Sequence, residues 1–287
     1  MSFPIQLVQT SFSLGAVLAW GSSDFLGGYG SRRANAYLLT AVAHASALIW
    51  ALMLVVTTHA VFPPMASARW AWLAGACGGA ALALFYGALS AGAMGLTAAV
   101  SAVVGAAIPA MVGIFVDGLP GRLALMGFAL AAVGIWLIAR PEAGGLSAKG
   151  FATAILCGVG FACFYLFMKR AGDASAVWGA TFSRFGALTM VVLIVVVGRH
   201  LNAASLKSMD AARWGIGAAA GVLDITGTMC YIWAVQRGRM DAAVMLTSLY
   251  PAITVTLARI FLREHFTRWK LVGMLAALAA VPLIATG

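Results

Sequence analysis

Long apolar runs, broken by short polar or charged segments, make up almost the whole chain. A helix that spans a lipid bilayer needs about 20 mostly apolar residues, and ten runs of about that length can be delimited. They cover residues 11–30, 36–58, 69–91, 96–117, 122–140, 148–170, 177–198, 212–236, 241–262 and 267–286. The segments between them carry turn or charge signals, except for the break near Gly92. The pattern predicts an all-α membrane protein with ten transmembrane helices and no domain outside the membrane.

Short motifs recur between the two halves of the chain at a nearly constant offset. Arg69-Trp70 returns as Arg213-Trp214, and Ala98-Ala99-Val100 returns as Ala242-Ala243-Val244, both 144 positions later. Elsewhere the offset drifts from 137 to 146, as small loop insertions in the second half would produce. Because each copy has five helices, the second copy enters the membrane from the opposite side, which gives the inverted repeat of many secondary transporters. We therefore expect a single integral membrane domain made of two inverted five-helix repeats, residues 1–145 and 146–287.

Composition removes most other classes of protein. Apolar residues make up 63% of the chain and charged residues only 9%, against about 25% charged in soluble domains. This excludes a soluble enzyme, a nucleic-acid-binding domain and a disordered chain. The net charge of +10 comes mostly from Lys and Arg in loops and at helix ends, where they set topology and meet lipid headgroups. The expected partners are the lipid bilayer and a small-molecule solute, with no nucleic acid, and the protein is expected to be a monomer or homodimer.

The first apolar run is expected to be a retained helix rather than a cleaved signal, because residues 1–10 carry no Lys or Arg. The four cysteines all fall in apolar runs, without a CxxC motif or a Cys/His cluster. We therefore expect free thiols, no metal site and no cofactor.

Four ionisable residues lie near the middle of apolar runs, where a charge is costly and by default marks a site or pathway: Asp24, His44, Arg184 and Asp224. Asp24 and Asp224 are candidates for proton coupling or for holding a substrate ammonium group. His44 and Arg184 are 140 positions apart, which makes them equivalents in the two repeats and predicts a place near a central cavity. Arg184 is expected either to pair with one of the two acids or to bind a carboxylate, and structural roles remain open for all four.

Several aromatic residues lie deep within the runs and could line such a cavity or stack on a cation, although each alone also suits packing. They are Trp20, Tyr86, Phe164, Tyr165, Tyr231 and Tyr250. Pro109 and Pro251 fall inside the fourth and ninth runs and predict helix kinks at a gate or cavity wall. Runs 122–140 and 267–286 have no ionisable residue deeper than their ends, so we expect these helices at the periphery.

The sequence lacks a nucleophile elbow, a zinc-protease motif and a phosphate-binding loop. We therefore expect no enzymatic activity. Two alternatives come from other functional classes. One is an intramembrane enzyme that acts on lipid and uses Asp24, Asp224 and His44. The other is a structural or receptor-like membrane protein.

Three stretches carry a resemblance to a known family. They are Ala19-Trp20-Gly21-Ser22-Ser23-Asp24-Phe25, the segment Phe164 to Arg170, and Leu249-Tyr250-Pro251-Ala252 followed by Leu262-Arg263-Glu264 and Gly273. With the ten runs in two halves, the chain resembles the drug/metabolite transporter superfamily, in particular its EamA-type members. The chain departs from the related small multidrug exporters, because Trp20 stands where they carry a membrane glutamate. It also has no mid-helix Lys, unlike members that carry organic phosphates.

The resemblance implies a secondary transporter in the bacterial inner membrane, with both termini in the cytoplasm. Positive charge is commoner in the loops on the other side, which by the positive-inside rule places the termini outside. Two acids and one arginine near mid-membrane suit small zwitterionic or cationic, amino-acid-like metabolites better than phosphate esters. We expect an exporter of such solutes that works by alternating access, or alternatively a drug or quaternary-cation proton antiporter.

Overall fold

The structure is a computed structural model that describes residues 3–90, 94–139, 148–172, 175–262 and 267–286. It is 88% helical, without a strand in these ranges. The helices are α1 (Phe3–Ser31), α2 (Ala36–Thr58), α3 (Met65–Ser90), α4 (Met94–Asp117), α5 (Arg122–Ala139), α6 (Ala148–Arg170), α7 (Ala176–Val197), α8 (Ala203–Lys207), α9 (Ala211–Arg237), α10 (Met240–Thr247), α11 (Tyr250–Leu262) and α12 (Arg268–Thr286).

Each predicted apolar run coincides with helical structure, and the all-helical membrane class is confirmed. Seven helical segments of the described chain are long and apolar enough to cross a bilayer. The ninth run differs from prediction, because it is divided into α10 and α11 by a break at Ser248 and Leu249. The short helix α8 lies in a linker that the apolar pattern left without structure. The predicted break near Gly92 and the predicted repeat boundary at residue 145 lie outside the described residues.

Polar side chains at the helix starts explain several of these boundaries. Asn35 precedes α2, and its side-chain oxygen accepts from the backbone N–H groups of Tyr37 and Leu38 at 3.0 and 3.2 Å. Asp210 precedes α9 and accepts from the backbone N–H of Arg213 at 2.9 Å. That hydrogen bond, with the guanidinium of the same residue, holds the pKa of Asp210 below its ordinary value. Such caps satisfy N–H groups that have no partner within the helix.

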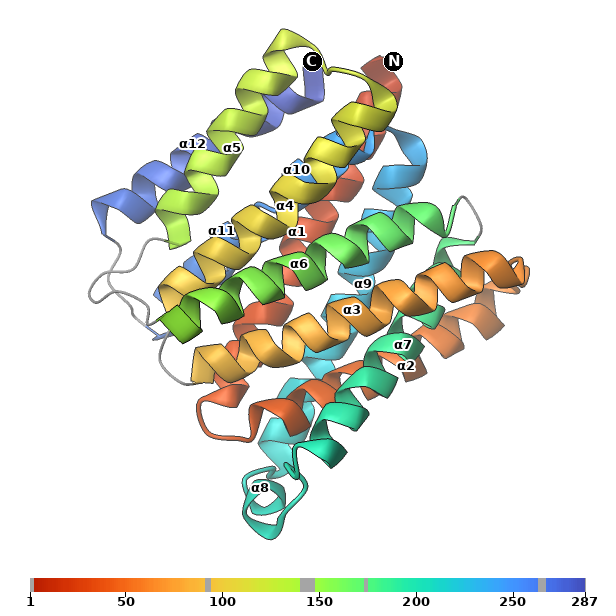
Figure 1. Cartoon of the computed structure of the whole chain (residues 1–287), viewed down its shortest axis with the longest axis vertical. Helices are drawn as coiled ribbons and strands as arrows, with labels where there is room; N and C mark the ends of the chain where they lie inside the picture. Colours follow the sequence, from red (N-terminus) through yellow and green to blue (C-terminus); the bar gives the residue numbers. More distant parts are fainter. Residues whose placement is uncertain (1–2, 91–93, 140–147, 173–174, 263–266, 287) are drawn as a thin grey trace.

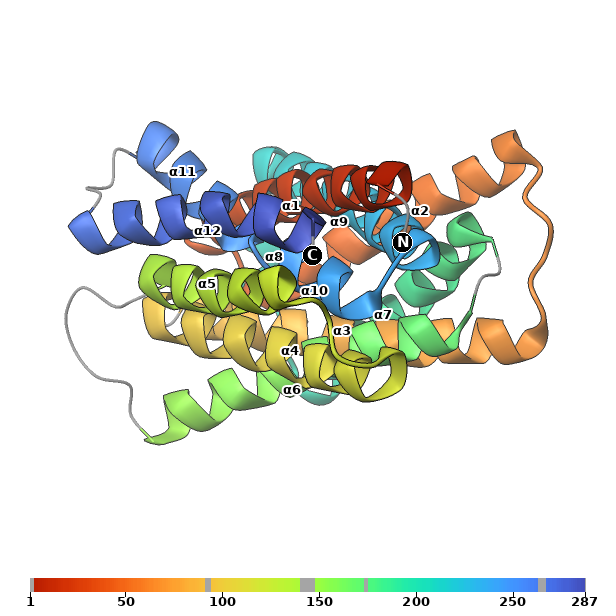
Figure 2. The same ribbon diagram turned by 90° about the horizontal axis from the view of Figure 1, so that it is seen from above.

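The two halves of the chain are interleaved. In the described chain the most extensive helix contacts all join the first half to the second: α1 packs on α9 and α11, and α6 packs on α3 and α4. α2 contacts α7 and α9, α3 contacts α7, and α5 contacts α12. Figure 1 shows α5 and α12 along one edge of the bundle and α2 and α7 toward the other, with α1, α3, α4, α6 and α9 between them. In Figure 2, α1 lies on one side of the bundle and α4 and α6 on the other.

Glycines allow two of these helix pairs to approach to backbone contact. A Cβ atom on Gly75 of α3 would overlap the backbone carbonyl of Ser183 in α7. A Cβ atom on Gly221 of α9 would overlap the carbonyl of Ala43 in α2. Close approach at small residues is how membrane helices gain van der Waals contact where the hydrophobic effect does not drive them together.

We expect Gly75→Ala to lower the thermal stability of the purified protein, at a cost of roughly 1–3 kcal/mol, the usual effect of overpacking a close contact. The obstacle is backbone rather than a flexible side chain, so α3 and α7 must separate. Gly215→Ala in α9 is the matched control, because a Cβ there meets nothing within 4 Å. Equal melting temperatures for the two variants would show that the crossing is looser than described.

An ion pair between the partly exposed Arg239 and a fully buried carboxylate joins the start of α10 to the end of α4. The guanidinium of Arg239 donates to both oxygens of Asp241, at 3.1 and 2.6 Å. It also donates to the backbone carbonyls of Asp117 and Gly118, at 3.0 and 2.5 Å. The side chain of Asp241 is 0% exposed. Gln9 of α1 donates to the carbonyl of Arg239 at 2.6 Å, so three helices meet at this point.

We expect Arg239→Met to destabilise the protein by about 2 kcal/mol or more, because it leaves a buried carboxylate without its cation. Arg213→Met is the control: its pair with Asp210 is exposed, and exposed pairs contribute about 0–1 kcal/mol. Thermal unfolding in detergent compares the two variants. A smaller loss for Arg239→Met than for Arg213→Met would contradict the role given to the Arg239–Asp241 pair.

Candidate functional site

One cavity holds most of the residues singled out from the sequence. Its walls enclose about 690 Å³ of empty space, the part open to solvent included. Its lining residues come from α1, α2, α3, α4, α6, α7, α9, α11 and the break after α10. They are Trp20, Asp24, His44, Gly75, Gly78, Gly79, Leu82, Ser101, Ala102, Gly105, Phe161, Phe164, Tyr165, Arg184, Asp224, Thr228, Ser248 and Tyr250.

The cavity lies away from α5 and α12. Among the described side chains, none from either helix lines it, and the two helices pack on each other at the edge of the bundle (Figure 1). The prediction that the fifth and tenth apolar runs form peripheral helices is confirmed. Glycines of α5 allow the close contact between the two helices: a Cβ on Gly127 would meet the backbone nitrogen of Ile284 at 3.0 Å, and a Cβ on Gly134 would meet the backbone of Gly273 and Ala277 in α12 within 3.4 Å.

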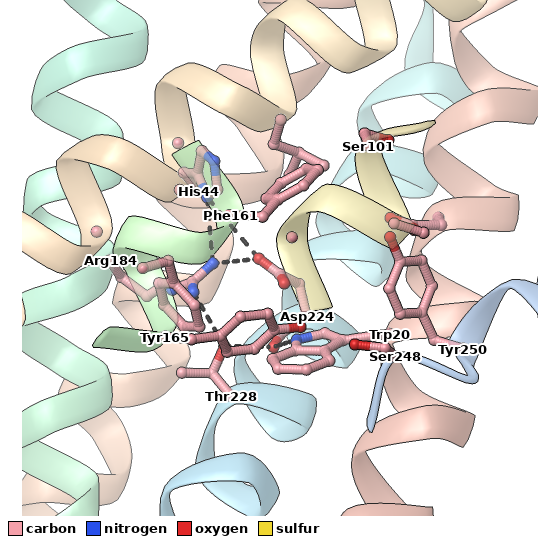
Figure 3. A pocket seen from close by; sticks show the side chains of 18 residues that line it. Trp20, His44, Ser101, Phe161, Tyr165, Arg184, Asp224, Thr228, Ser248 and Tyr250 are labelled. Carbon is pink, nitrogen blue, oxygen red and sulfur yellow. Dashed lines mark hydrogen bonds and ion pairs between the residues drawn. The ribbon is translucent and has the colours of Figure 1, made fainter. Parts of the chain in front are cut away.

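Arg184 is the centre of the polar part of the cavity wall (Figure 3). One terminal nitrogen of its guanidinium forms an ion pair with Asp224. The other donates to the hydroxyl of Thr228 at 2.9 Å. Arg184 is only 5% exposed, so its charge requires compensation within the protein. Asp224 supplies this compensation. The sequence left open whether Arg184 pairs with Asp24 or with Asp224, and in the structure it pairs with Asp224.

His44 and Trp20 complete this polar group. The Nδ1 atom of His44 lies 3.4 Å from the guanidinium of Arg184, which brings together the two residues that are 140 positions apart. The indole N–H of Trp20 donates to the backbone carbonyl of Asp224 at 3.2 Å, and the hydroxyl of Thr228 donates to the same carbonyl at 3.0 Å. Side chains from α1, α2, α7 and α9 thereby form one connected network.

Asp24 stands apart from this network. It lines the cavity from α1 and is only partly buried. The hydroxyl of Tyr86 donates to its Oδ1 atom at 3.3 Å. Within the described part of the chain, no ion pair joins Asp24 to a basic side chain. The two acids predicted as equivalent candidates therefore differ: Asp224 is committed to Arg184, and Asp24 is not.

Two predicted cavity residues lie behind the wall instead of on it. Tyr86 and Tyr231 are 1% and 0% exposed, and neither is among the residues that border the cavity. Tyr86 supports Asp24, as described. The hydroxyl of Tyr231 donates to the backbone carbonyl of Tyr165 at 3.3 Å, and its ring lies 4.9 Å from the ring of Tyr165. Neither ring reaches the cavity surface in this conformation, because each packs among helices and buries its hydroxyl with a partner. Contact of these two residues with solute stays a prediction.

Aromatic rings form the apolar part of the wall. Trp20, Phe164 and Tyr165 line the cavity, and the centroid of the Trp20 ring lies 6.3 and 6.1 Å from those of the other two. Phe161 and Tyr250 add further rings from α6 and α11 (Figure 3). The cavity thus combines an ionic group, a separate carboxylate and several aromatic faces.

One of the two prolines lies where it was predicted, and the other does not. Pro109 lies inside α4, as predicted, and α4 remains one helix. Pro251 is the second residue of α11, after the break, so a kink within a continuous helix is the wrong description there. The first turn of a helix tolerates proline, because its N–H groups lack intrahelical partners in any case. Neither proline borders the cavity, whereas Ser248 at the break does.

Some lining residues were not selected from the sequence, among them Phe161 and Ser248. Phe161 lies 137 positions after Asp24, the offset that relates Gly21 to Gly158, so the repeat could have pointed to it. Ser248 gives no comparable signal, since its position depends on where the ninth run breaks.

Comparisons with known proteins define the class. Residues 148–286 match the model of the EamA-like transporter family. A crystal structure that shares 15% sequence identity has the same fold, with a TM-score of 0.75 over 96% of this chain and 95% of that one. An uncharacterized protein of Methanocaldococcus jannaschii is 32% identical over 63 residues, 22% of this chain and 46% of that protein. The chain thus spans about half the length of this curated relative.

The apolar helices and the family match together indicate an integral, multi-pass membrane protein that is similar to transporters. The matched family belongs to the drug/metabolite transporter superfamily, and the match covers the second half of the chain, in agreement with the resemblance seen in the sequence.

Proposed function

We propose that this protein is a secondary transporter, working as an exporter, of small cationic or zwitterionic metabolites, and that the solute binds in the cavity lined by Asp24 and the Arg184–Asp224 pair. The observation that carries the proposal is the gathering of the mid-helix ionisable residues on one cavity wall. An intramembrane ionisable group without function is rarely retained. The bacterial inner membrane is the proposed location.

We further propose that ten membrane crossings form two inverted repeats, with the cavity between them. The packing between the two halves supports this arrangement. α1 packs on α9, and α6, the proposed equivalent of α1, packs on α3, the proposed equivalent of α9. The glycine crossings support it as well: Gly75 meets Ser183 and Gly221 meets Ala43, and Ser183 lies 140 positions after Ala43. Residues near a two-fold axis contact their own equivalents, as His44 and Arg184 do.

A screen followed by a flux assay tests this function. Purified protein is heated with amino acids, polyamines, sugars, nucleosides or quaternary ammonium compounds, and the most stabilising compound becomes the radiotracer. We expect saturable counterflow of that compound into proteoliposomes preloaded with it, and none into protein-free liposomes. The pH dependence of uptake against a gradient then identifies proton antiport, the second candidate mode. Stabilisation without flux, or chemical conversion of the compound, would contradict a transporter and favour the enzyme alternative.

A further inference from the structure

The cavity wall carries two acidic side chains and one arginine. This excess of acidic groups bears on which solute can bind. Arg184 is neutralised by Asp224. Its second terminal nitrogen is taken by Thr228. Its remaining nitrogen, Nε, has no accessible surface in this conformation. A carboxylate arriving from solution would therefore have to compete with Asp224 for one guanidinium, and two carboxylates there would repel each other.

Asp24 is the ionisable group of the wall that lacks an opposite charge. Among the described lining residues the only fixed cation is Arg184, and the partner of Asp24 is a neutral hydroxyl, that of Tyr86. Trp20, one helical turn before Asp24 on α1, also faces the cavity. A carboxylate beside aromatic faces is the combination that binds an ammonium group, since both the charge and the ring quadrupoles attract a cation.

We propose that the cavity selects solutes with a single positive charge, that their ammonium group binds Asp24, and that the Arg184–Asp224 pair acts against carboxylate-bearing solutes instead of receiving them. This inference rests on the proposed function and narrows it, from zwitterionic or cationic solutes to cationic ones. A zwitterion placed on Asp24 would bury its carboxylate without a free counter-charge, and such burial is costly unless the charge is paired.

Three probes with one skeleton separate the charge states. Phenylalanine has an ammonium and a carboxylate, phenethylamine lacks the carboxylate, and 3-phenylpropionate lacks the ammonium. Competition with the radiotracer on purified protein gives a relative affinity for each. We expect phenethylamine to bind at least about tenfold more tightly than phenylalanine, a difference of about 1.4 kcal/mol, and 3-phenylpropionate to bind most weakly.

Two variants examine the physical cause. Asp224→Asn frees the guanidinium of Arg184, and we expect it to reverse the order of phenethylamine and phenylalanine. If that variant does not fold, Arg184→Gln combined with Asp224→Asn removes both charges together, and the preference for phenethylamine over phenylalanine should persist. Asp24→Asn should remove the preference in either background.

The outcomes distinguish this inference from the proposed function. Cation selection is overturned if phenylalanine binds as tightly as phenethylamine, or if 3-phenylpropionate binds better than either. If the bound compound is still transported, the proposed transporter function stands. Failure of all three probes, with a class of compound transported that carries no positive charge, also overturns cation selection. Failure of every compound in the screen to bind or move overturns the proposed function itself.

Discussion

Asp224→Asn is expected to destabilise the protein by about 3–5 kcal/mol, the usual cost of removing one partner from a buried ion pair. Arg184 is 5% exposed and cannot lose its charge. Without Asp224, its guanidinium would keep the hydrogen bond to Thr228 and the contact with His44, but neither supplies a negative charge. Thermal unfolding of the purified variant in detergent measures the loss.

The control is the double variant Arg184→Gln with Asp224→Asn, which removes both charges. We expect it to recover most of the lost stability, because replacing a whole buried pair is far less costly than breaking one. Asp210→Asn, in an exposed pair, should leave the melting temperature close to that of the unmodified protein. A double variant as unstable as Asp224→Asn alone would mean that the two side chains are not each other's partners.

Much of the fold follows from the apolar pattern alone. A bilayer fixes the length of a spanning helix, and Lys, Arg, Gly and Pro mark the turns, so the predicted runs and the observed helices agree closely. The exceptions lie where the pattern gives no information. Helix α8 is set by the polar cap of Asn202, whose side-chain oxygen accepts from the backbone N–H of Ser205. The break between α10 and α11 lies just before Pro251, where proline begins a helix instead of kinking one.

The sequence predicts which residues belong to the candidate site better than it predicts their contacts. Asp24, His44, Arg184 and Asp224 all reach the cavity, because ionisable side chains at mid-helix are forced away from lipid. Which acid pairs with Arg184 depends on how α1, α7 and α9 are rotated against one another, and no sequence pattern states that rotation. For the same reason the sequence predicts Tyr86 and Tyr231 on the cavity wall, whereas in the structure they lie behind it.

Hydrogen-bond partners give these two tyrosines roles that residue type alone does not indicate. The hydroxyl of Tyr86 is the one described partner of the Asp24 carboxylate. Tyr231 orders Tyr165, which borders the cavity. They lie 145 positions apart, within the range of offsets at which motifs recur along the sequence. The ring of Tyr86 lies near Gly27 of α1, and the ring of Tyr231 lies on Tyr165 of α6.

Asp24→Asn is expected to have the largest effect on transport. If Asp24 holds the ammonium group of the solute, the amide cannot replace its charge, and uptake should fall at least about tenfold, the consequence of losing 1.5 kcal/mol or more from a charged hydrogen bond. Thermal stability should change little, because Asp24 is partly exposed to the cavity and is not the partner of Arg184. Asp210→Asn, outside the cavity, should transport normally.

The most direct test of the site is to compare uptake driven by a pH gradient with solute exchange at equal pH, in proteoliposomes containing Asp24→Asn. Binding of the solute at Asp24 is required in both modes, whereas proton coupling is required only in the first. We expect uptake and exchange to fall together, with the melting temperature near that of the unmodified protein. Exchange at the unmodified rate would show that Asp24 does not hold the solute, and unchanged uptake as well would show that the cavity is not the transport site.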